Sequence, residues 1–129
     1  MTTHSILIVD DNPTNLKLVR VILEGEAHTV VTAENAEEAL ETLETFQPDL
    51  ILMDIQLPGM DGLTLTRRLR NELRWQDTTI VALTAYAMKG DEEKATLAGC
   101  DGYITKPIDP TLLPGVVAGY LARRRPPAE

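Results

Sequence analysis

The sequence predicts an α/β fold in which a parallel sheet is covered by helices on both faces. Short apolar runs, many of them β-branched or leucine-rich, alternate along the chain with longer stretches whose apolar residues recur at helical spacing. The 129 residues suit one compact domain, so we expect a single domain over residues 1–129. Its folded core is expected at about residues 4–123, followed by a short tail that contains proline.

Five apolar runs have the length expected of strands that are buried in a parallel sheet. They are Ser5 to Val9, His28 to Ala33, Leu50 to Met53, Thr79 to Leu83 and Gly102 to Thr105. A segment with helical spacing follows each of them, as repeated βα units require. The sequence therefore predicts five strands.

The first two helices are predicted from their starting residues and their apolar spacing. Asn12 can cap the free N–H groups of a helix that begins at Pro13, because proline is tolerated at the first helical position. Asn35 and Glu38 resemble a capping box, and the apolar residues after them share one helical stripe that ends before Pro48. The second of these helices has the clearer pattern.

A third helix is predicted after a turn. Pro58 and Gly59 provide the turn signal, and the residues that follow include three leucines at helical spacing, Leu65, Leu69 and Leu73. We therefore expect one helix to include all three leucines.

The last two helices have weaker signals. A polar segment from Asp91 to Ala98 precedes Gly99, and glycine commonly follows the last residue of a helix. The final helix is expected to begin at Pro110 and to run toward Arg123. Because Pro114 lies near its start and an interior proline removes a backbone donor, we expect an irregular first turn.

Composition limits the classes of partner. Twelve basic and twenty acidic residues give a formal net charge of −8, which disfavours non-specific binding to nucleic acid or to an anionic membrane. Cys100 is the only cysteine, so no internal disulfide can form. No apolar stretch is long enough for a bilayer span or a secretory signal, and we expect a cytoplasmic protein without nucleic-acid or membrane partners.

Polar residues follow four of the predicted strands at the point where each strand ends. Asp10 and Asp11 follow the first strand, Asp54 the third, Thr84 the fourth and Lys106 the fifth. Because parallel strands bring their carboxyl ends to one edge of the sheet, we expect these side chains to converge. Clustered carboxylates repel one another unless a cation is bound, and an oxygen-only set suits Mg²⁺ better than zinc. The sequence therefore predicts a magnesium site.

Four segments resemble the response-regulator receiver domains of two-component signalling. They are Ile6 to Asn12, Leu52 to Gly62, Ala82 to Ala85 and Tyr103 to Pro107. Each segment alone is a weak signal, but four in this order at the strand ends form a specific one. The resemblance implies a flavodoxin-like, doubly wound five-stranded parallel sheet with strand order 2-1-3-4-5. It is compatible with a stand-alone regulator and with a receiver excised from a hybrid histidine kinase.

The resemblance also implies that the chain takes a phosphoryl group from phosphohistidine. Asp54 would be the acceptor, and its carboxylate oxygen would attack phosphorus to give an acyl phosphate. Asp10, Asp11, Asp54 and the backbone carbonyl of Gln56 would hold Mg²⁺. The chain would then be a phospho-acceptor switch that assists its own phosphorylation and dephosphorylation, and not an enzyme.

A switch around the phosphoryl group is implied as well. Lys106 and the hydroxyl of Thr84 would each contact a phosphoryl oxygen, and the peptide bond between Lys106 and Pro107 would be cis. Movement of Thr84 would let Tyr103 turn inward, changing the face built from the fourth helix, the fifth strand and the fifth helix. The implied partners are a histidine kinase or histidine phosphotransfer protein and a downstream protein at that face, with the chain a monomer or weak dimer.

Three other functions stay open on the sequence alone. An aspartate-nucleophile phosphatase of the haloacid-dehalogenase type would also form an acyl phosphate, but it would carry Asp-x-Asp, whereas Asp10 and Asp11 are adjacent. A flavodoxin-like cofactor carrier would have a phosphate loop rich in hydroxyls and glycine instead of an acidic one. An unphosphorylated protein-interaction module would keep only the fold.

Overall fold

The computed structural model describes residues 4–85 and 89–122 of the chain. In this part, five parallel strands form one sheet with the order β2-β1-β3-β4-β5, which confirms the predicted fold class. The strands are β1 (Ser5–Val9), β2 (Thr29–Ala33), β3 (Leu50–Asp54), β4 (Thr79–Thr84) and β5 (Gly102–Thr105).

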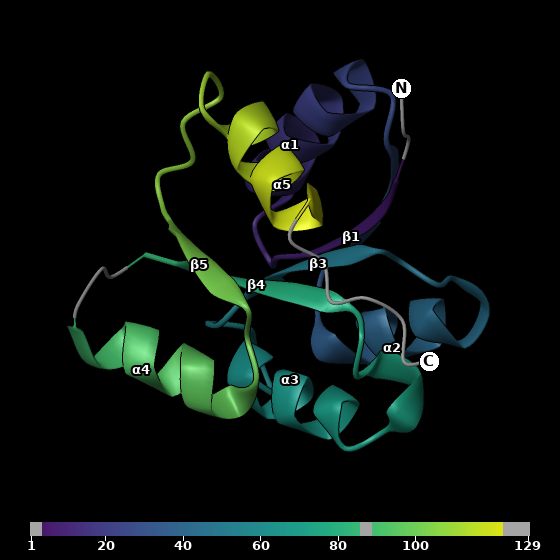
Figure 1. The fold of residues 1–129 in the computed structure, drawn as a ribbon, viewed down its shortest axis with the longest axis vertical. Helices are drawn as coiled ribbons and strands as arrows, with labels where there is room; N and C mark the ends of the chain where they lie inside the picture. Colours follow the sequence, from purple (N-terminus) through teal and green to yellow (C-terminus); the bar gives the residue numbers. More distant parts are fainter. Residues whose placement is uncertain (1–3, 86–88, 123–129) are drawn as a thin grey trace.

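Helices cover both faces of this sheet. They are α1 (Pro13–Gly25), α2 (Ala36–Thr45), α3 (Gly62–Arg70), α4 (Lys89–Ala98) and α5 (Leu113–Ala122), with a short 3₁₀ helix η1 (Leu73–Trp75) after α3. Figure 1 shows α1 and α5 on one face and α2, α3 and α4 on the other. None of the helices in residues 4–85 and 89–122 combines the length and the apolar character needed to cross a membrane.

The core has two parts, one on each face of the sheet, because successive residues of a strand point in opposite directions. In β1, Leu7 and Val9 belong to the part beneath α2 and α3, while Ile6 and Ile8 belong to the part beneath α1 and α5. These four side chains are at most 1% exposed. The strand is therefore buried on both sides, as expected of the centre of a parallel sheet.

The strand register fixes which strand ends are neighbours. Val9 of β1 pairs with Met53 of β3, so the residues that follow them, Asp10 and Asp54, lie side by side at this edge of the sheet. On the other side of β3, Thr84 at the end of β4 pairs with Thr105, the residue before Lys106. The backbone alone thus brings the predicted site residues to one edge of the sheet.

Side-chain caps start the first two helices as predicted. The Oδ1 atom of Asn12 accepts hydrogen bonds from the backbone N–H groups of Thr14 and Asn15 at 2.9 and 3.2 Å. At the start of α2, Asn35 Oδ1 accepts from the backbone N–H of Glu38 at 2.8 Å, and Asn35 Nδ2 donates to Glu38 Oε2 at 3.3 Å. Both helices begin where their caps place them.

The prediction that one helix includes Leu65, Leu69 and Leu73 is wrong for Leu73, which lies in η1. The two earlier leucines are buried, but α3 ends at Arg70 and Leu73 is 84% exposed. The N–H of Glu72 bonds to the carbonyl of Leu69 at 3.0 Å, an i to i−3 bond that tightens the turn after α3. This turn rotates Leu73 outward and carries Trp75, the last residue of η1, into the core.

The predicted start of the last helix at Pro110 is also wrong. The helix begins at Leu113, after a turn in which Asp109 Oδ1 accepts from the N–H of Thr111 at 2.8 Å. With this start Pro114 lies in the first helical turn, where its missing N–H leaves no bond unmade. The expected end near Arg123 lies outside the described residues.

Other boundaries differ from the predicted ones by one or two residues. They are Thr29 for the start of β2, Asp54 and Thr84 for the ends of β3 and β4, and Lys89 for the start of α4. Hydrogen bonds of the ladder extend past the apolar run, as when the N–H of Ile55 donates to the carbonyl of Leu83. Apolar character therefore marks the strand ends less sharply than backbone pairing does.

The helix α5 is joined to β5 through a tyrosine. The hydroxyl of Tyr120 donates to the backbone carbonyl of Tyr103 at 3.4 Å. The Tyr120 ring occupies the space that a side chain at Gly102 would enter, so this position of β5 accepts only glycine without a shift of the ring.

Candidate functional site

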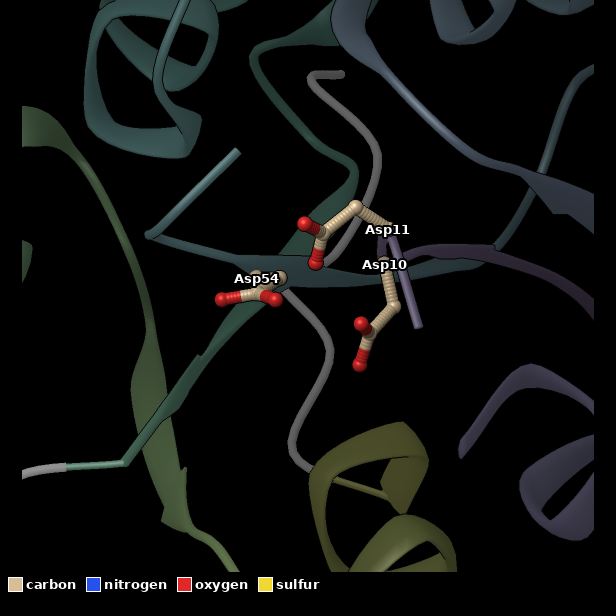
Figure 2. A group of neighbouring side chains, drawn as sticks. All are labelled: Asp10, Asp11 and Asp54. Carbon is tan, nitrogen blue, oxygen red and sulfur yellow. The ribbon is translucent and has the colours of Figure 1, made fainter. Parts of the chain in front are cut away.

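Three carboxylates meet where β1 and β3 end. Asp10 and Asp11 follow β1, and Asp54 is the last residue of β3; an oxygen from each lies within 4.8 Å of the others. Figure 2 shows the three side chains gathered at this edge of the sheet. Asp10 and Asp54 are buried, at 0% and 3% exposure, whereas Asp11 is exposed. The cluster therefore has two buried carboxylates and one that faces solvent.

Lys106 joins the two buried carboxylates. Its Nζ atom lies 3.0 Å from Asp10 Oδ2 and 2.9 Å from Asp54 Oδ2. The loop after β5 directs it there: the N–H of Lys106 donates to the carbonyl of Thr84 at 2.7 Å, and the bond to Pro107 is cis, the isomer that the family resemblance implied. The residue predicted to carry the positive charge is thus in contact with the predicted acceptor.

Main-chain N–H groups hold the other oxygens of these carboxylates. Asp10 Oδ1 accepts from the N–H of Asn12, and Asp54 Oδ1 accepts from the N–H of Gln56, both at 2.9 Å. Asp10 Oδ2 also accepts from the side-chain amide of Asn15 at 3.5 Å. With one oxygen bonded to the backbone and the other to Lys106, each buried carboxylate has a fixed orientation.

Burial and charge act in opposite directions on this pair. Burial raises the pKa of Asp54, and the nearby Asp10 adds to the effect, while the Gln56 N–H and Lys106 counteract it. For Lys106, burial lowers the pKa, but its hydrogen bonds to Asp54 and Asp10 outweigh burial and leave the pKa above its usual value. Lys106 is therefore cationic at neutral pH.

The donor set fits a hard divalent cation. Three carboxylates and one ammonium leave two negative charges in a small volume, which a single divalent ion balances. The donors are oxygens, with no thiolate or imidazole among them, and such sets favour Mg²⁺ or Ca²⁺ over zinc. The cluster can therefore hold a metal of the predicted kind.

Thr84 and Tyr103, the predicted switch residues, lie on the strands beside the cluster. Thr84 ends β4 and is buried at 3% exposure, while Tyr103 is the second residue of β5 and is 36% exposed. The pKa of Tyr103 is raised, chiefly by the charge of Glu92 on α4. The exposure of Tyr103 shows that its side chain is not packed into the core.

A glycine behind the site was missed in the sequence. A Cβ atom at Gly62, the first residue of α3, would overlap the backbone carbonyl of Asp54. The N–H of Gly62 donates to the carbonyl of Ile55 at 3.3 Å, so α3 begins directly against the end of β3. In the sequence, Gly62 stands out only as the last residue of the segment Leu52 to Gly62, because a close approach between segments has no local pattern.

Asn15 was missed as well. Its position in the first turn of α1, five residues after Asp10, could have suggested a side chain that folds back toward the strand end. Helical spacing alone does not distinguish such a contact from an ordinary exposed polar residue.

Comparison with known proteins identifies the family. The family model described as the response regulator receiver domain matches residues 6–118, which is most of the chain. The polar-differentiation response regulator DivK of Brucella ovis is 40% identical over 119 residues, covering 92% of this chain and 97% of that protein. These matches agree with the four sequence segments that resemble receiver domains.

Solved structures give the same result. A CheY-like response regulator receiver domain protein from Methanospirillum hungatei superposes with a TM-score of 0.85 at 32% identity, covering 94% of this chain and 95% of the other. The receiver domain of the sensor histidine kinase PA1611 from Pseudomonas aeruginosa, which has a magnesium ion coordinated in its active-site cleft, gives 0.84 at 31% identity, covering 94% and 99%. By sequence and by fold, the chain belongs to the response regulator receiver domain family.

Proposed function

We propose that the chain is a phospho-accepting receiver that takes a phosphoryl group from phosphohistidine onto Asp54. One observation supports this most strongly: the buried Asp54 carboxylate lies 2.9 Å from Lys106 Nζ, and Lys106 also reaches Asp10 at 3.0 Å. A carboxylate paired with an ammonium beside further carboxylates suits phosphoryl transfer, in which positioning and charge neutralisation supply most of the rate.

The transfer forms one bond and breaks another. A carboxylate oxygen of Asp54 attacks phosphorus, the bond from phosphorus to the donor's imidazole nitrogen breaks, and that nitrogen keeps the electron pair. Lys106 then faces an oxygen of the transferred group, and the hydroxyl of Thr84 donates to another. Attack of water on the acyl phosphate reverses the state and releases inorganic phosphate.

Asp10, Asp11, Asp54 and the backbone carbonyl of Gln56 are the proposed ligands of Mg²⁺. The oxygen-only cluster and its two unbalanced negative charges support this assignment. Bound Mg²⁺ would offset negative charge on the phosphoryl oxygens. The magnesium ion in the PA1611 receiver, at 31% identity, supports the choice of metal.

Phosphorylation is proposed to change the face built from α4, β5 and α5. The charge of about −2 on a phosphoryl group would attract the Thr84 hydroxyl and make room for Tyr103 to turn inward. Each of these elements carries an exposed apolar side chain: Leu97 on α4, Tyr103 on β5 and Val116 on α5. These residues would be the contact surface for a downstream protein.

The proposed setting is two-component signalling in the cytoplasm. Residues 1–129 would act as one receiver domain with a core at about 4–123, in keeping with the family match over 6–118. The phosphoryl donor would be a histidine kinase or a histidine phosphotransfer protein, and the chain would be a monomer or weak dimer. As a phospho-acceptor it would turn over no external substrate.

Intact mass after incubation with a small acyl-phosphate donor tests the proposal. The wild type is expected to gain a single phosphoryl adduct in the presence of Mg²⁺ and none in EDTA. Asp54→Asn is expected to gain none under either condition, because the amide is not a nucleophile. Asp77→Asn is the matched control, since Asp77 is an exposed carboxylate that precedes β4 at the opposite end of the strand, and it should behave like the wild type.

The other outcomes separate the alternatives. An adduct that persists in Asp54→Asn would assign the acceptor elsewhere. A folded wild type that stays unmodified even with a phosphohistidine donor would make the chain a protein-interaction module. Continuous hydrolysis of a phosphomonoester, measured as released phosphate, would instead indicate a phosphatase.

A further inference from the structure

Asn15 contacts the carboxylate cluster of Asp10, Asp11 and Asp54 from the first turn of α1. Its side-chain Nδ2 donates to Asp10 Oδ2 at 3.5 Å, and the residue is half-buried. Its backbone N–H is bonded separately, to Asn12 Oδ1 at 3.2 Å, as part of the helix cap. The backbone of Asn15 thus takes part in the cap, while its side-chain amide donates to a carboxylate of the site.

Few groups hold the Asp10 carboxylate. Oδ1 accepts from the N–H of Asn12 at 2.9 Å, and Oδ2 lies 3.0 Å from Lys106 Nζ and 3.5 Å from Asn15 Nδ2. Within the described residues, the side chains that donate to Asp10 are thus those of Lys106 and Asn15. Of these two, Lys106 is shared with Asp54, at 2.9 Å, and Asn15 is not.

The contact of Lys106 with both Asp10 and Asp54 becomes important once Asp54 carries a phosphoryl group. This step rests on the proposed function. Lys106 then faces a phosphoryl oxygen, so its contact with Asp10 weakens while the contact of Asn15 stays. We propose that Asn15 is a positioning residue, whose amide keeps Asp10 oriented for Mg²⁺ both before and after phosphorylation. Because the amide is neutral, it orients the carboxylate without repelling a cation.

Asn15→Ala and Asn15→Leu test the role, with Mg²⁺ binding measured by calorimetry in the absence of any phosphoryl donor. Losing the hydrogen bond from a neutral amide to a ligand carboxylate is expected to raise the Mg²⁺ dissociation constant about threefold to tenfold in both variants. The gain in helix propensity from alanine or leucine offsets the lost hydrogen bond, and Asp10 keeps the Asn12 N–H and Lys106 as partners, so the melting temperature in EDTA should change little. A merely structural role would lower the melting temperature and leave the dissociation constant unchanged.

Phosphorylation gives a second measurement. The Mg²⁺ concentration for half-maximal adduct formation is expected to rise in the Asn15 variants by the same factor, while the maximal extent at saturating Mg²⁺ is retained. Thr14→Ala is the control, because Thr14 is an exposed neighbour in the same helical turn whose backbone N–H, not its side chain, bonds to Asn12. It should match the wild type in both measurements.

The outcomes distinguish the inference from the function on which it rests. Mg²⁺ dissociation constants within twofold of the wild type in both Asn15 variants would overturn the role of Asn15, whatever the adduct formation. A wild type that binds Mg²⁺ but forms no adduct would overturn the proposed function, and the Asn15 role would then be judged on Mg²⁺ binding. A wild type that does not bind Mg²⁺ would overturn both.

Discussion

At the scale of single residues, the site depends on positions where a side chain larger than that of glycine would overlap neighbouring atoms. Gly62 is the clearest of them, because the backbone carbonyl of Asp54 fills the place where its side chain would begin. The obstacle is main chain at the end of β3, which cannot rotate away as a side chain could. The orientation of Asp54 is therefore linked to a residue that has no chemistry of its own.

Gly62→Ala is expected to lower the free energy of unfolding by about 2–4 kcal/mol, because the new methyl group must displace the end of β3. Urea denaturation measures this. Gly25→Ala is the matched control: no atom lies within 4 Å of a Cβ there, so the change should be neutral or stabilising by up to about 1 kcal/mol. Equal effects at the two positions would contradict the steric argument.

His28 lies at the other end of the sheet, beside His4. The backbone N–H of His4 donates to His28 Nδ1 at 3.3 Å, so His28 accepts this bond only while Nδ1 is unprotonated. The two rings lie 5.8 Å apart. Burial lowers the pKa of His28 from 6.5, the nearby His4 lowers it further, and Glu26 acts in the opposite direction.

This pKa shift predicts a pH dependence of stability. The unfolded chain binds the proton of His28 more readily than the folded chain, so stability should fall as pH drops below about 6.5 and level off below the folded-state pKa. His28 is partly exposed, so we expect a loss below about 1 kcal/mol.

His28→Asn should remove this component, because Asn Oδ1 can accept the same N–H without titrating. The measurement is the free energy of unfolding at pH 7.5 and at pH 5, compared between the two proteins. If the variant loses as much stability as the wild type over this range, the pH dependence comes from other groups.

At the scale of helices and strands, sequence patterns predicted the elements better than their ends. All five strands and the caps at Asn12 and Asn35 could be predicted, because apolar runs and capping residues act locally. The position of Leu73 outside α3 could not be predicted, because its spacing fits that helix but the chain turns tightly after Arg70. The convergence of the acidic residues followed from strand order, whereas the donors to each oxygen depend on tertiary packing.

Arg70 connects the end of α3 to two other segments. Its Nε donates to the carbonyl of Gly99 at 2.9 Å, and its Nη1 donates to the carbonyls of Trp75 and Thr78, both at 2.7 Å. Its Nη2 lies 2.8 Å from Asp101 Oδ2. One side chain thus satisfies carbonyls after α3, before β4 and after α4, and the planar guanidinium makes these bonds at once.

Arg70→Ala is expected to lower the free energy of unfolding by about 2–4 kcal/mol, because several carbonyls and the Asp101 carboxylate lose a partner. Arg70→Lys should recover only part of the loss, since an ammonium cannot reach all of them. Arg67→Ala, an exposed arginine of the same helix, should change stability by less than about 0.5 kcal/mol in a urea titration. Equal effects at Arg67 and Arg70 would contradict this role.

At the scale of the whole molecule, the two parts of the core share one sheet. The strands β1, β2, β3 and β4 contribute side chains to both parts, as Leu50 and Ile51 do for β3. Neither part can lose its strands without exposing the other. The domain is therefore expected to unfold as one cooperative unit.

Trp75 provides a test of this cooperativity, because it is buried at 2% exposure in the part of the core beneath α2 and α3. Its fluorescence and the far-ultraviolet circular dichroism, which reports all helices, should give the same urea midpoint. Two separated midpoints would mean that the faces of the sheet unfold independently.

Tyr120, which joins α5 to β5, affects how a change in β5 is transmitted to α5 and α4. Tyr120 bonds to the main-chain carbonyl of Tyr103, so this tether does not depend on which side chain stands at that position. Glu92 of α4, by contrast, is the main cause of the raised pKa of the Tyr103 phenol, so it acts on the side chain itself. A displacement of the β5 backbone would therefore act on α5, whereas a change in the rotamer of Tyr103 would act on α4. The two helices thus respond to different changes in the same strand.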